Sequence, residues 1–397
     1  MTVLYIGNWG FTPGQKKGIS RFSYDEKTGA VELLDTVLPE VAAGQLALDA
    51  ERGILYAVNE CGNRNNEYGG GGELLSLKIE ADGSLRLMNR RDSLCPEPSY
   101  LVPDGTGKYI LTAHHCDPWH VTKLKRLPDG TLTNEVLFDD GSVVLYRLNE
   151  DGTVGDAVDA LIYGADSRLD ERHQVNVDPV SGHIQLIEIC SRLHSVTMSP
   201  DGKMFIACDK GLDKIYAFRL DREKGRLYNT DCYEARWASF PRYSAFHPAL
   251  NVFYANSELC PDVNTFRYDS KKGTMEHIGT ASLFFTDPGL IDGKPAGAQD
   301  ILCSPDGRTL YVTATGTDSI SVFSLFGEGL PTLTQVVSCG GKFPRGIALS
   351  PDGRFLLCGN MLSGTVSSFK VNADGTLTST GKSFEAVSPS ALKFFEI

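Results

Sequence analysis

The chain has no cluster of basic residues and no long apolar run. Its 397 residues include 50 Asp and Glu against 38 Lys and Arg, for a formal net charge of −12. Binding to nucleic-acid phosphates requires a basic surface, so we expect no nucleic-acid partner. No stretch approaches the roughly 18 apolar residues that span a membrane. Residues 1–7 lack the basic and apolar regions of a secretion signal, so we expect a cytoplasmic protein without a membrane partner.

Paired cysteine motifs are also absent. The ten cysteines are scattered along the chain, and no Cys-x-x-Cys pair occurs. Cys208, Cys303 and Cys358 fall inside expected strands, where a thiol behaves as a small apolar side chain. In a chain without a secretion signal such cysteines are expected to stay reduced. We therefore predict no disulfide bonds.

One segment contains metal-ligating residue types, but at unsuitable spacing. It holds His114, His115, Cys116, Asp117 and His120. Adjacent residues of a strand point to opposite faces, and this spacing matches no structural zinc signature. We predict no metal ion and no other cofactor, and we assign His115 to a small-molecule site instead.

The strongest signal in the sequence is a repeat. A Ser-Pro-Asp-Gly turn occurs at residues 199–202, 304–307 and 350–353, with degenerate copies at 247–248 and 104–109. A second pair of strands follows each time, seven in all. Units of roughly 57 residues that consist only of short strands are typical of a propeller or a β-solenoid.

The repeat is out of phase at the two ends of the chain. The chain opens on a lone strand at residues 3–7, and it closes on residues 391–395, which resemble the first strand of a unit. The two ends would complete one shared blade, and closing the ring removes exposed sheet edges. We predict an all-β fold, a seven-bladed β-propeller with four-stranded blades, in a single domain spanning residues 1–397.

Two insertions interrupt the repeat. One runs from His114 to Gly141, between the second and third strands of its blade, and the other runs from Asp156 to Arg192. Propellers place their specificity in loops. Both insertions are therefore candidates for shaping a binding site.

The repeat also predicts which residues surround the central channel. First strands line the channel, and each begins at the end of the blade where the second strand stops. One ring is formed by the residues six positions before the turn proline, namely Gly44, Ser99, His194, Arg242, Gln299 and Arg345. A second ring lies ten positions after it, namely Glu60, His115, Lys210, Glu258, Thr315 and Met361, with Asp209 and Asn360 one position earlier.

These rings hold more ionisable side chains than strand ends require. Two arginines and a histidine would attract an anionic or oxygen-rich small molecule. A carboxylate beside an imidazole is a common acid–base pair near neutral pH. The alternative is that the charges only pair with one another and hold water. We interpret this mouth as a candidate site, with the following residues in binding roles: Glu60, His115, Asp209, Lys210, Gln299 and Arg345.

Several of these segments resemble a known family. The segments are residues 193–202 with 209–215, 241–248 with 254–259, 343–349, 56–60 and 391–394. They resemble the blade motifs of seven-bladed propeller lactonases, a family that includes propeller-type 6-phosphogluconolactonase and the fungal carboxy-cis,cis-muconate cyclase. The resemblance covers nearly the whole chain. It departs at the two insertions and at His114-His115-Cys116, where small polar residues are usual.

The resemblance implies a set of catalytic residues. The muconate cyclase site contains a His, an Arg, a Glu and a second Arg. By motif and spacing, the first three correspond to His194, Arg242 and Glu258. The second Arg falls near Thr315 and is missing here, which counts against a tricarboxylic muconolactone as the substrate. Arg345 belongs to another blade.

The resemblance therefore implies a metal-independent lactonase that opens a small sugar-derived or other hydroxy-acid lactone. Glu258 or His194 would act as general base, while Arg242, with Arg345, would bind the anionic group or the oxyanion. One alternative is a cycloisomerase that forms a lactone from an unsaturated carboxylic acid with the same groups. Another is a propeller that binds a small ligand without catalysis. The sequence does not predict an oligomeric state.

Overall fold

The computed structural model describes residues 2–10, 14–64, 67–68, 70–116, 120–164, 176–177, 184–185 and 190–397. Every regular element within these residues is a β-strand. A membrane-crossing helix is accordingly not found in the described part of the chain.

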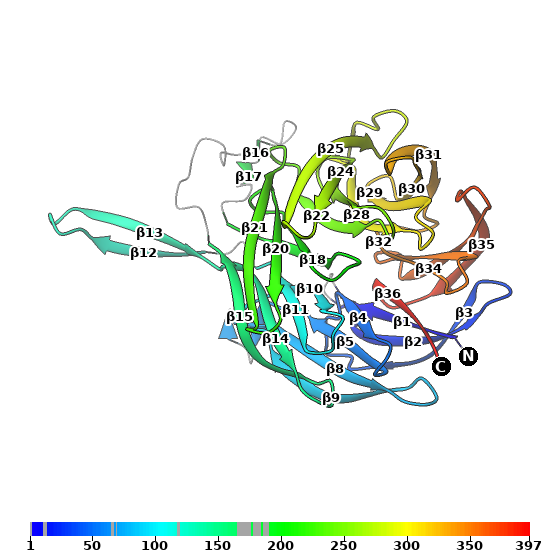
Figure 1. Cartoon of the computed structure of the whole chain (residues 1–397), viewed down its shortest axis with the longest axis horizontal. Helices are drawn as coiled ribbons and strands as arrows, with labels where there is room; N and C mark the ends of the chain where they lie inside the picture. The colour runs from blue at the N-terminus through cyan, green and yellow to red at the C-terminus, as the bar shows by residue number, and fades with distance from the viewer. Residues whose placement is uncertain are drawn as a thin grey trace.

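Seven four-stranded antiparallel sheets form the body, which makes the fold the predicted seven-bladed β-propeller (Figure 1). From the innermost strand outward, the blades are β36 (Pro389–Glu396), β1 (Thr2–Asn8), β2 (Gly18–Asp25), β3 (Ala30–Val37); β4 (Leu46–Asp49), β5 (Ile54–Asn59), β8 (Glu73–Ile79), β9 (Leu85–Asp92); β10 (Pro98–Pro103), β11 (Tyr109–His114), β14 (Gly141–Leu148), β15 (Val154–Tyr163); β18 (Leu193–Met198), β19 (Phe205–Asp209), β20 (Lys214–Asp221), β21 (Arg226–Glu234); β22 (Pro241–Phe246), β23 (Val252–Ser257), β24 (Asp262–Asp269), β25 (Thr274–Ser282); β28 (Gly297–Cys303), β29 (Thr309–Thr315), β30 (Ser319–Phe326), β31 (Leu330–Ser338); and β32 (Pro344–Leu349), β33 (Phe355–Asn360), β34 (Thr365–Val371), β35 (Leu377–Glu385).

The two ends of the chain close the ring, as the sequence predicted. β36 pairs with β1 from Glu396 opposite Thr2 to Pro389 opposite Asn8, and Figure 1 shows the termini side by side. Each innermost strand also contacts the innermost strands of both neighbouring blades. Main-chain hydrogen bonds between β1 and β36 therefore close the ring at the blade that contains both ends of the chain.

Repeated contacts hold adjacent blades together. Tyrosine hydroxyls on second strands donate to glycine carbonyls in the outer turn of the next blade. These pairs, at 2.7–2.8 Å, are Tyr5 with Gly83, Tyr56 with Gly152, Tyr254 with Gly329 and Tyr311 with Gly375. Apolar side chains fill the space between the blades, as where Leu111 and Val143 pack with Phe205 and Phe218.

The Ser-Pro-Asp-Gly turns have the geometry that their sequence requires. In the turn at 199–202, the Ser199 hydroxyl donates to Asp201 at 2.7 Å and accepts from the Met204 amide at 3.0 Å. Gly202 has a φ of +69°, in the left-handed region that favours glycine. These tight turns leave the end of the ring that they occupy without long loops.

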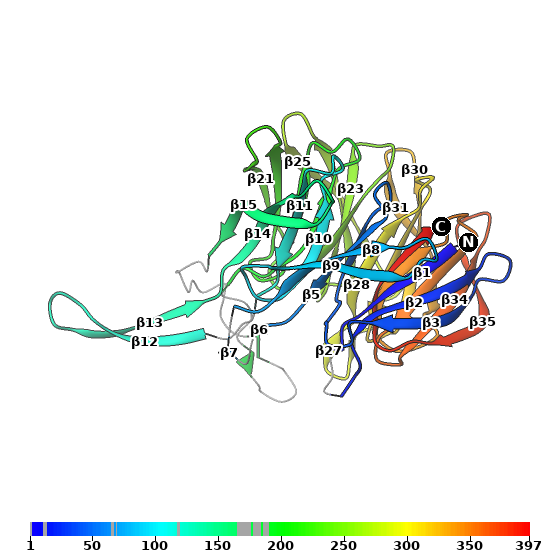
Figure 2. The same cartoon turned by 90° about the horizontal axis from the view of Figure 1, so that it is seen from below.

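The described residues form four additional hairpins, which all lie at the opposite end of the ring, where second strands stop and first strands begin. They are β6 (Asn63–Arg64) with β7 (Glu67–Tyr68), β12 (His120–Arg126) with β13 (Leu132–Phe138), β16 (Asn176–Val177) with β17 (Ile184–Gln185), and β26 (Leu290–Ile291) with β27 (Lys294–Pro295). Figure 2 shows β6, β7, β27 and the β12–β13 hairpin on this side. This end of the ring therefore carries the structure that the repeat does not explain.

The boundary predicted for the second insertion was wrong. Residues 156–163 belong to β15, the outer strand of its blade, so the insertion begins after Tyr163. An outer strand faces solvent and carries a weak apolar pattern. The polar residues Asp156 and Asp159 therefore made this strand look like a loop in the sequence. Most of residues 165–189 lie outside the described residues.

The ten cysteines are free thiols in the structure. Cys208 and Cys358 are buried in second strands as predicted, while Cys303 is half-buried and Cys232 is exposed. Burial raises the pKa of the Cys303 thiol to about 12, so it is protonated at neutral pH.

Candidate active site

β-Bulges mark the ring of residues predicted at the channel mouth. The pairing of β18 with β19 shifts between Leu193 and Ser195, and that of β32 with β33 shifts between Pro344 and Gly346. His194 and Arg345 occupy these shifts. The pairings at Ser99, Arg242 and Gln299 are interrupted in the same way. A bulge re-aims a side chain out of the regular strand alternation, and bulges are frequent beside active sites.

Glu258 is held between two cations. Its Oε2 accepts a hydrogen bond from Nε of Arg242 at 3.1 Å and lies 2.8 Å from Nζ of Lys210. Arg242 also donates from Nη1 to the main-chain oxygen of Gln299 at 2.5 Å. Burial alone would raise the pKa of Glu258, but Lys210 and Arg242 outweigh it and lower the pKa to about 2. Glu258 is therefore a fixed negative charge at neutral pH.

Glu60 is a second buried carboxylate, whose pKa is shifted upward and not downward. Its side chain is buried, and its Oε2 accepts no hydrogen bond from the described residues. Among the described residues the closest cation is Arg345, whose Nη2 lies 3.8 Å from Oε2 of Glu60. The guanidinium carbon of Arg345 lies 3.8 Å from the Trp9 ring centroid. Burial raises the pKa of Glu60 to about 7, although Arg345, Arg242 and Lys210 act in the other direction. Glu60 can therefore exchange a proton near neutral pH.

Two histidines lie against each other at the same mouth. The ring centroids of His115 and His194 are 5.0 Å apart, and the His194 ring is 5.2 Å from Tyr243. Burial, and then the charges of nearby arginines, hold the pKa of both histidines well below its usual value. Nδ1 of His115 is 3.2 Å from Arg192 and 3.5 Å from Glu97. Both imidazoles are therefore neutral at pH 7.

Asp209, which the sequence predicts in a substrate-binding role, is fully buried and hydrogen-bonded within the protein. Its carboxylate accepts from the Ser191 hydroxyl and from the amides of Arg192, Gly211 and Leu212. Two of these hydrogen bonds come from residues 191–192, which precede β18, and two come from residues 211–212, which follow β19. Its neighbour Lys210 points to Glu258 instead, because successive residues at a strand end alternate in direction.

The same alternation separates His114 from His115. Nδ1 of His114 lies 3.1 Å from the Ser142 hydroxyl inside the blade, and burial lowers the pKa of His114 to about 4. Within the described residues, no group of three His, Cys, Asp or Glu side chains could hold a metal ion. Asp117 lies outside those residues.

The remaining ring positions supply main-chain or structural contacts. Gln299 offers its carbonyl oxygen to Arg242, and its side-chain amide donates to the Thr315 hydroxyl at 3.4 Å. The Ser99 hydroxyl donates to the main-chain oxygen of His194 at 3.1 Å. The ionisable side chains that act on one another at this mouth include Glu60, His115, His194, Lys210, Arg242, Glu258 and Arg345.

Four contributors were not predicted from the sequence. Trp9 supports Arg345, and Tyr243 lies 4.5 Å from the guanidinium carbon of Arg242. Arg192 and Glu97 contact His115. Arg192 and Glu97 each precede a residue of the first ring by two positions. Counting eight positions back from the turn proline, in addition to six, would therefore have found them.

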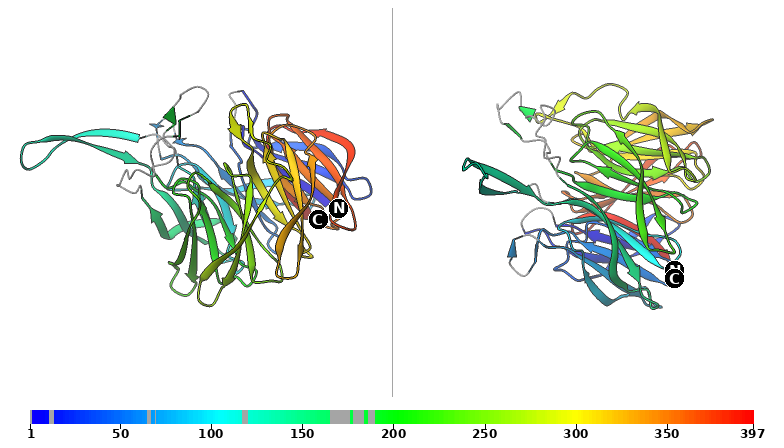
Figure 3. Two further views of the ribbon diagram at one scale, coloured as in Figure 1. Left: turned by 90° about the horizontal axis from the view of Figure 1, so that it is seen from above. Right: turned by 60° about the vertical axis from the view of Figure 1, so that its left-hand side comes forward.

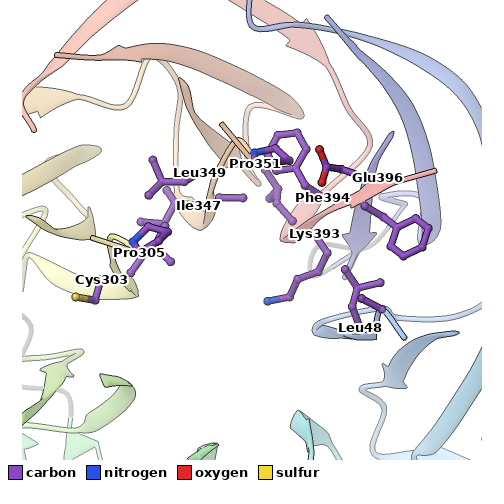
Figure 4. A pocket seen from close by; sticks show the side chains of 14 residues that line it. Leu48, Cys303, Pro305, Ile347, Leu349, Pro351, Lys393, Phe394 and Glu396 are labelled. Atoms are coloured by element: carbon purple, nitrogen blue, oxygen red, sulfur yellow. The ribbon is translucent and has the colours of Figure 1, made fainter. Parts of the chain in front are cut away.

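The other mouth of the channel is built differently. A pocket of about 570 Å³ lies where the inner strands end, and its lining includes Leu48, Ile347, Leu349, Lys393 and Glu396 (Figure 4). In this lining the charged side chains are one lysine and one glutamate, with no histidine or arginine. The acid–base groups therefore gather at the mouth that carries the additional hairpins.

The comparisons with known proteins agree with the propeller fold. A family model described as a seven-bladed β-propeller lactonase matches residues 3–394. The 6-phosphogluconolactonase of Bacillus subtilis is 24% identical over 402 aligned residues, which cover 98% of each chain. The structure of the Pseudomonas aeruginosa periplasmic gluconolactonase PpgL matches with a TM-score of 0.78 at 23% identity, over 100% of this chain and 99% of its own, and so supports the fold. The chain belongs to the family of seven-bladed β-propeller lactonases.

Proposed function

We propose that this protein hydrolyses a small sugar-derived or hydroxy-acid lactone by side-chain chemistry, without a metal ion. The observation that supports this best is the environment of Glu60. Its carboxylate is buried, has a pKa of about 7 and interacts electrostatically with three cationic side chains. A general base is most effective when its pKa lies near the working pH. Cations around it suit a reaction in which a carbonyl oxygen becomes negatively charged.

In the proposed reaction, ionised Glu60 takes a proton from the attacking water. Addition of water turns the lactone carbonyl into a tetrahedral oxyanion, which Arg242 and Lys210 stabilise. The ring C–O bond then breaks, and Glu60 returns its proton to the departing oxygen. One water and one lactone give one hydroxy acid, and Glu60 is restored.

His194 is proposed as a neutral hydrogen-bond donor to the substrate. Its Nδ1 is buried and has no hydrogen-bond partner among the described residues, which favours the tautomer with the proton on Nε2. The lowered pKa keeps the ring uncharged. His194 would thus hold the substrate without competing with Glu60 for the proton.

Glu258 is proposed as the group that positions the cations. The sequence left the general-base role open between Glu258 and His194. A carboxylate with a pKa of about 2 and two cationic partners is a poor proton acceptor at neutral pH. Its contacts instead fix Arg242 and Lys210 side by side, so the structure favours transferring the base role from Glu258 to Glu60.

Arg345, His115 and Gln299 are proposed to contact the remainder of the substrate. Two of the relatives are named for gluconolactone or its 6-phosphate. The cations at this mouth are compatible with either compound. The cytoplasmic location expected from the sequence stays a prediction.

A lactone panel tests this function. Acid release would be measured for glucono-δ-lactone, its 6-phosphate, a muconolactone and simple γ-lactones, with wild type and with Glu60→Gln. We expect a sugar lactone to open faster than in buffer with wild type only. If no lactone opens faster than in buffer, hydrolysis is wrong, and cyclisation of unsaturated acids and ligand binding without turnover are tested next.

Gly44 provides a second test of the role of Glu60. A Cβ added to Gly44 would overlap Oε2 of Glu60, so Gly44→Ala should displace the carboxylate. We expect kcat to fall about tenfold, since small displacements of a reacting group are costly. In the Glu60→Gln background the same substitution should have little further effect. An equal loss in both backgrounds would show that Gly44 acts independently of Glu60.

A further inference from the structure

The β12–β13 hairpin, residues 120–138, is an arm outside the propeller. The two strands pair from His120 opposite Phe138 to Arg126 opposite Leu132, and they form a sheet of their own. Figures 1, 2 and 3 show the arm projecting away from the blades. A two-stranded ribbon alone is only marginally stable in water, so contacts outside its own protomer would stabilise it.

The arm exposes large aliphatic side chains. Leu124 is 77% exposed, Val121 59%, Leu132 53% and Leu137 41%. Val121 and Leu137 are direct partners in the ladder and share one face, whereas Leu124 and Leu132 lie on the other face. An element with apolar residues on both faces and no core to cover them is an interaction surface.

The two edges of the arm differ in chemistry. β12 carries Lys123, Lys125 and Arg126 among its seven residues. Lysines on an edge strand discourage pairing with another strand. β13 reads Leu-Thr-Asn-Glu-Val-Leu-Phe, with a single charged residue and no proline. The edge open to another strand is therefore that of β13.

We propose that the β13 edges of two copies of this chain pair antiparallel around a two-fold axis and join two propellers through a four-stranded sheet. Identical antiparallel strands are self-complementary, so a second copy closes the contact without a different partner. A centre at Asn134 places Glu135 opposite a threonine and avoids two glutamates face to face. In this register Leu132 of each copy lies opposite residue 136 of the other copy, on one face of the joined sheet.

The oligomeric state tests this proposal. Sedimentation of wild type at roughly micromolar concentrations, the usual range for specific dimers, should show a dimer. In a deletion variant, Asn-Gly replaces residues 121–137, so that a two-residue turn connects the paired residues His120 and Phe138. It should be a monomer with the thermal unfolding of wild type, because the arm forms a sheet of its own. A wild-type monomer, or a dimer that survives removal of the arm, would overturn the proposal.

Cysteine cross-linking tests which edge pairs. Asn134 is exposed on β13, and a cysteine there would face its own copy across the axis. Mild oxidation of Asn134→Cys should give a covalent dimer. The control Thr122→Cys is also exposed but lies on β12, and it should behave like wild type with its ten native thiols. A dimer that is cross-linked through residue 122 and not residue 134 would refute the β13 pairing.

Discussion

Replacement of Glu60 by glutamine is expected to lower kcat by about 10²-fold or more, the usual contribution of a positioned proton acceptor. The ionised carboxylate accepts the proton, and its pKa lies at about 7. Wild-type kcat should therefore rise as the pH increases through this value. Glutamine does not titrate, so this rise should disappear in the variant. The check is a pH-stat measurement of kcat between about pH 5.5 and 8, with spontaneous lactone opening subtracted.

Glu258→Gln is the matched control for this experiment. It removes a carboxylate from the same mouth, but one whose pKa is about 2 and which does not titrate in this range. We expect it to raise KM and lower kcat, because Arg242 and Lys210 lose their shared partner, while the rise near pH 7 stays. If Glu258→Gln removed the rise and Glu60→Gln kept it, the roles proposed for the two carboxylates would be reversed.

The positions of the site residues could be predicted because the fold repeats. Each blade contributes one residue to each ring, at a fixed distance in sequence from its turn proline. Arg242, Arg345 and Glu258 could therefore be assigned to the mouth without any knowledge of contacts. The alternation of strand residues separates Lys210, which contacts Glu258 at the mouth, from Asp209, which accepts hydrogen bonds from residues 191–192 and 211–212. Which of the two side chains points into the mouth depends on the exact residue at which the strand ends. The repeat predicts the strand end only to within one residue.

The properties of those residues could not be predicted in the same way. Glu60 and Glu258 occupy equivalent positions and carry the same side chain, yet their pKa values lie on opposite sides of the ordinary value. Glu258 has a cation at hydrogen-bonding distance on each of two blades, whereas the nearest cation to Glu60 in the described part of the chain, Arg345, is 3.8 Å away. This difference arises from which cation each blade places beside its glutamate: Arg242 lies in the same blade as Glu258 and Lys210 in the preceding one, whereas Arg345 reaches Glu60 from a blade distant in the sequence.

Arg242→Met is expected to lower kcat/KM by about 10²- to 10³-fold, the cost of losing one donor to an oxyanion. Methionine keeps an unbranched apolar chain beside Tyr243, so the main change is loss of the guanidinium. Arg242 is almost fully buried and makes hydrogen bonds to both Glu258 and the Gln299 carbonyl. Unfolding should become easier by about 1–3 kcal/mol, because Gln299 loses its donor while Lys210 still neutralises Glu258. Steady-state kinetics and thermal unfolding measure the two effects.

Arg242→Lys separates the charge of this residue from its geometry. A lysine restores a cation for Glu258, but it is a point charge that lacks the rigid planar fork linking Glu258 to the Gln299 carbonyl. We therefore expect the lysine variant to recover most of the stability and only a minor part of kcat/KM. Recovery of both would mean that Arg242 acts on the reaction only as a positive charge. Loss of stability with unchanged kcat/KM in either variant would place Arg242 in the structural support of the mouth and remove it from the oxyanion site.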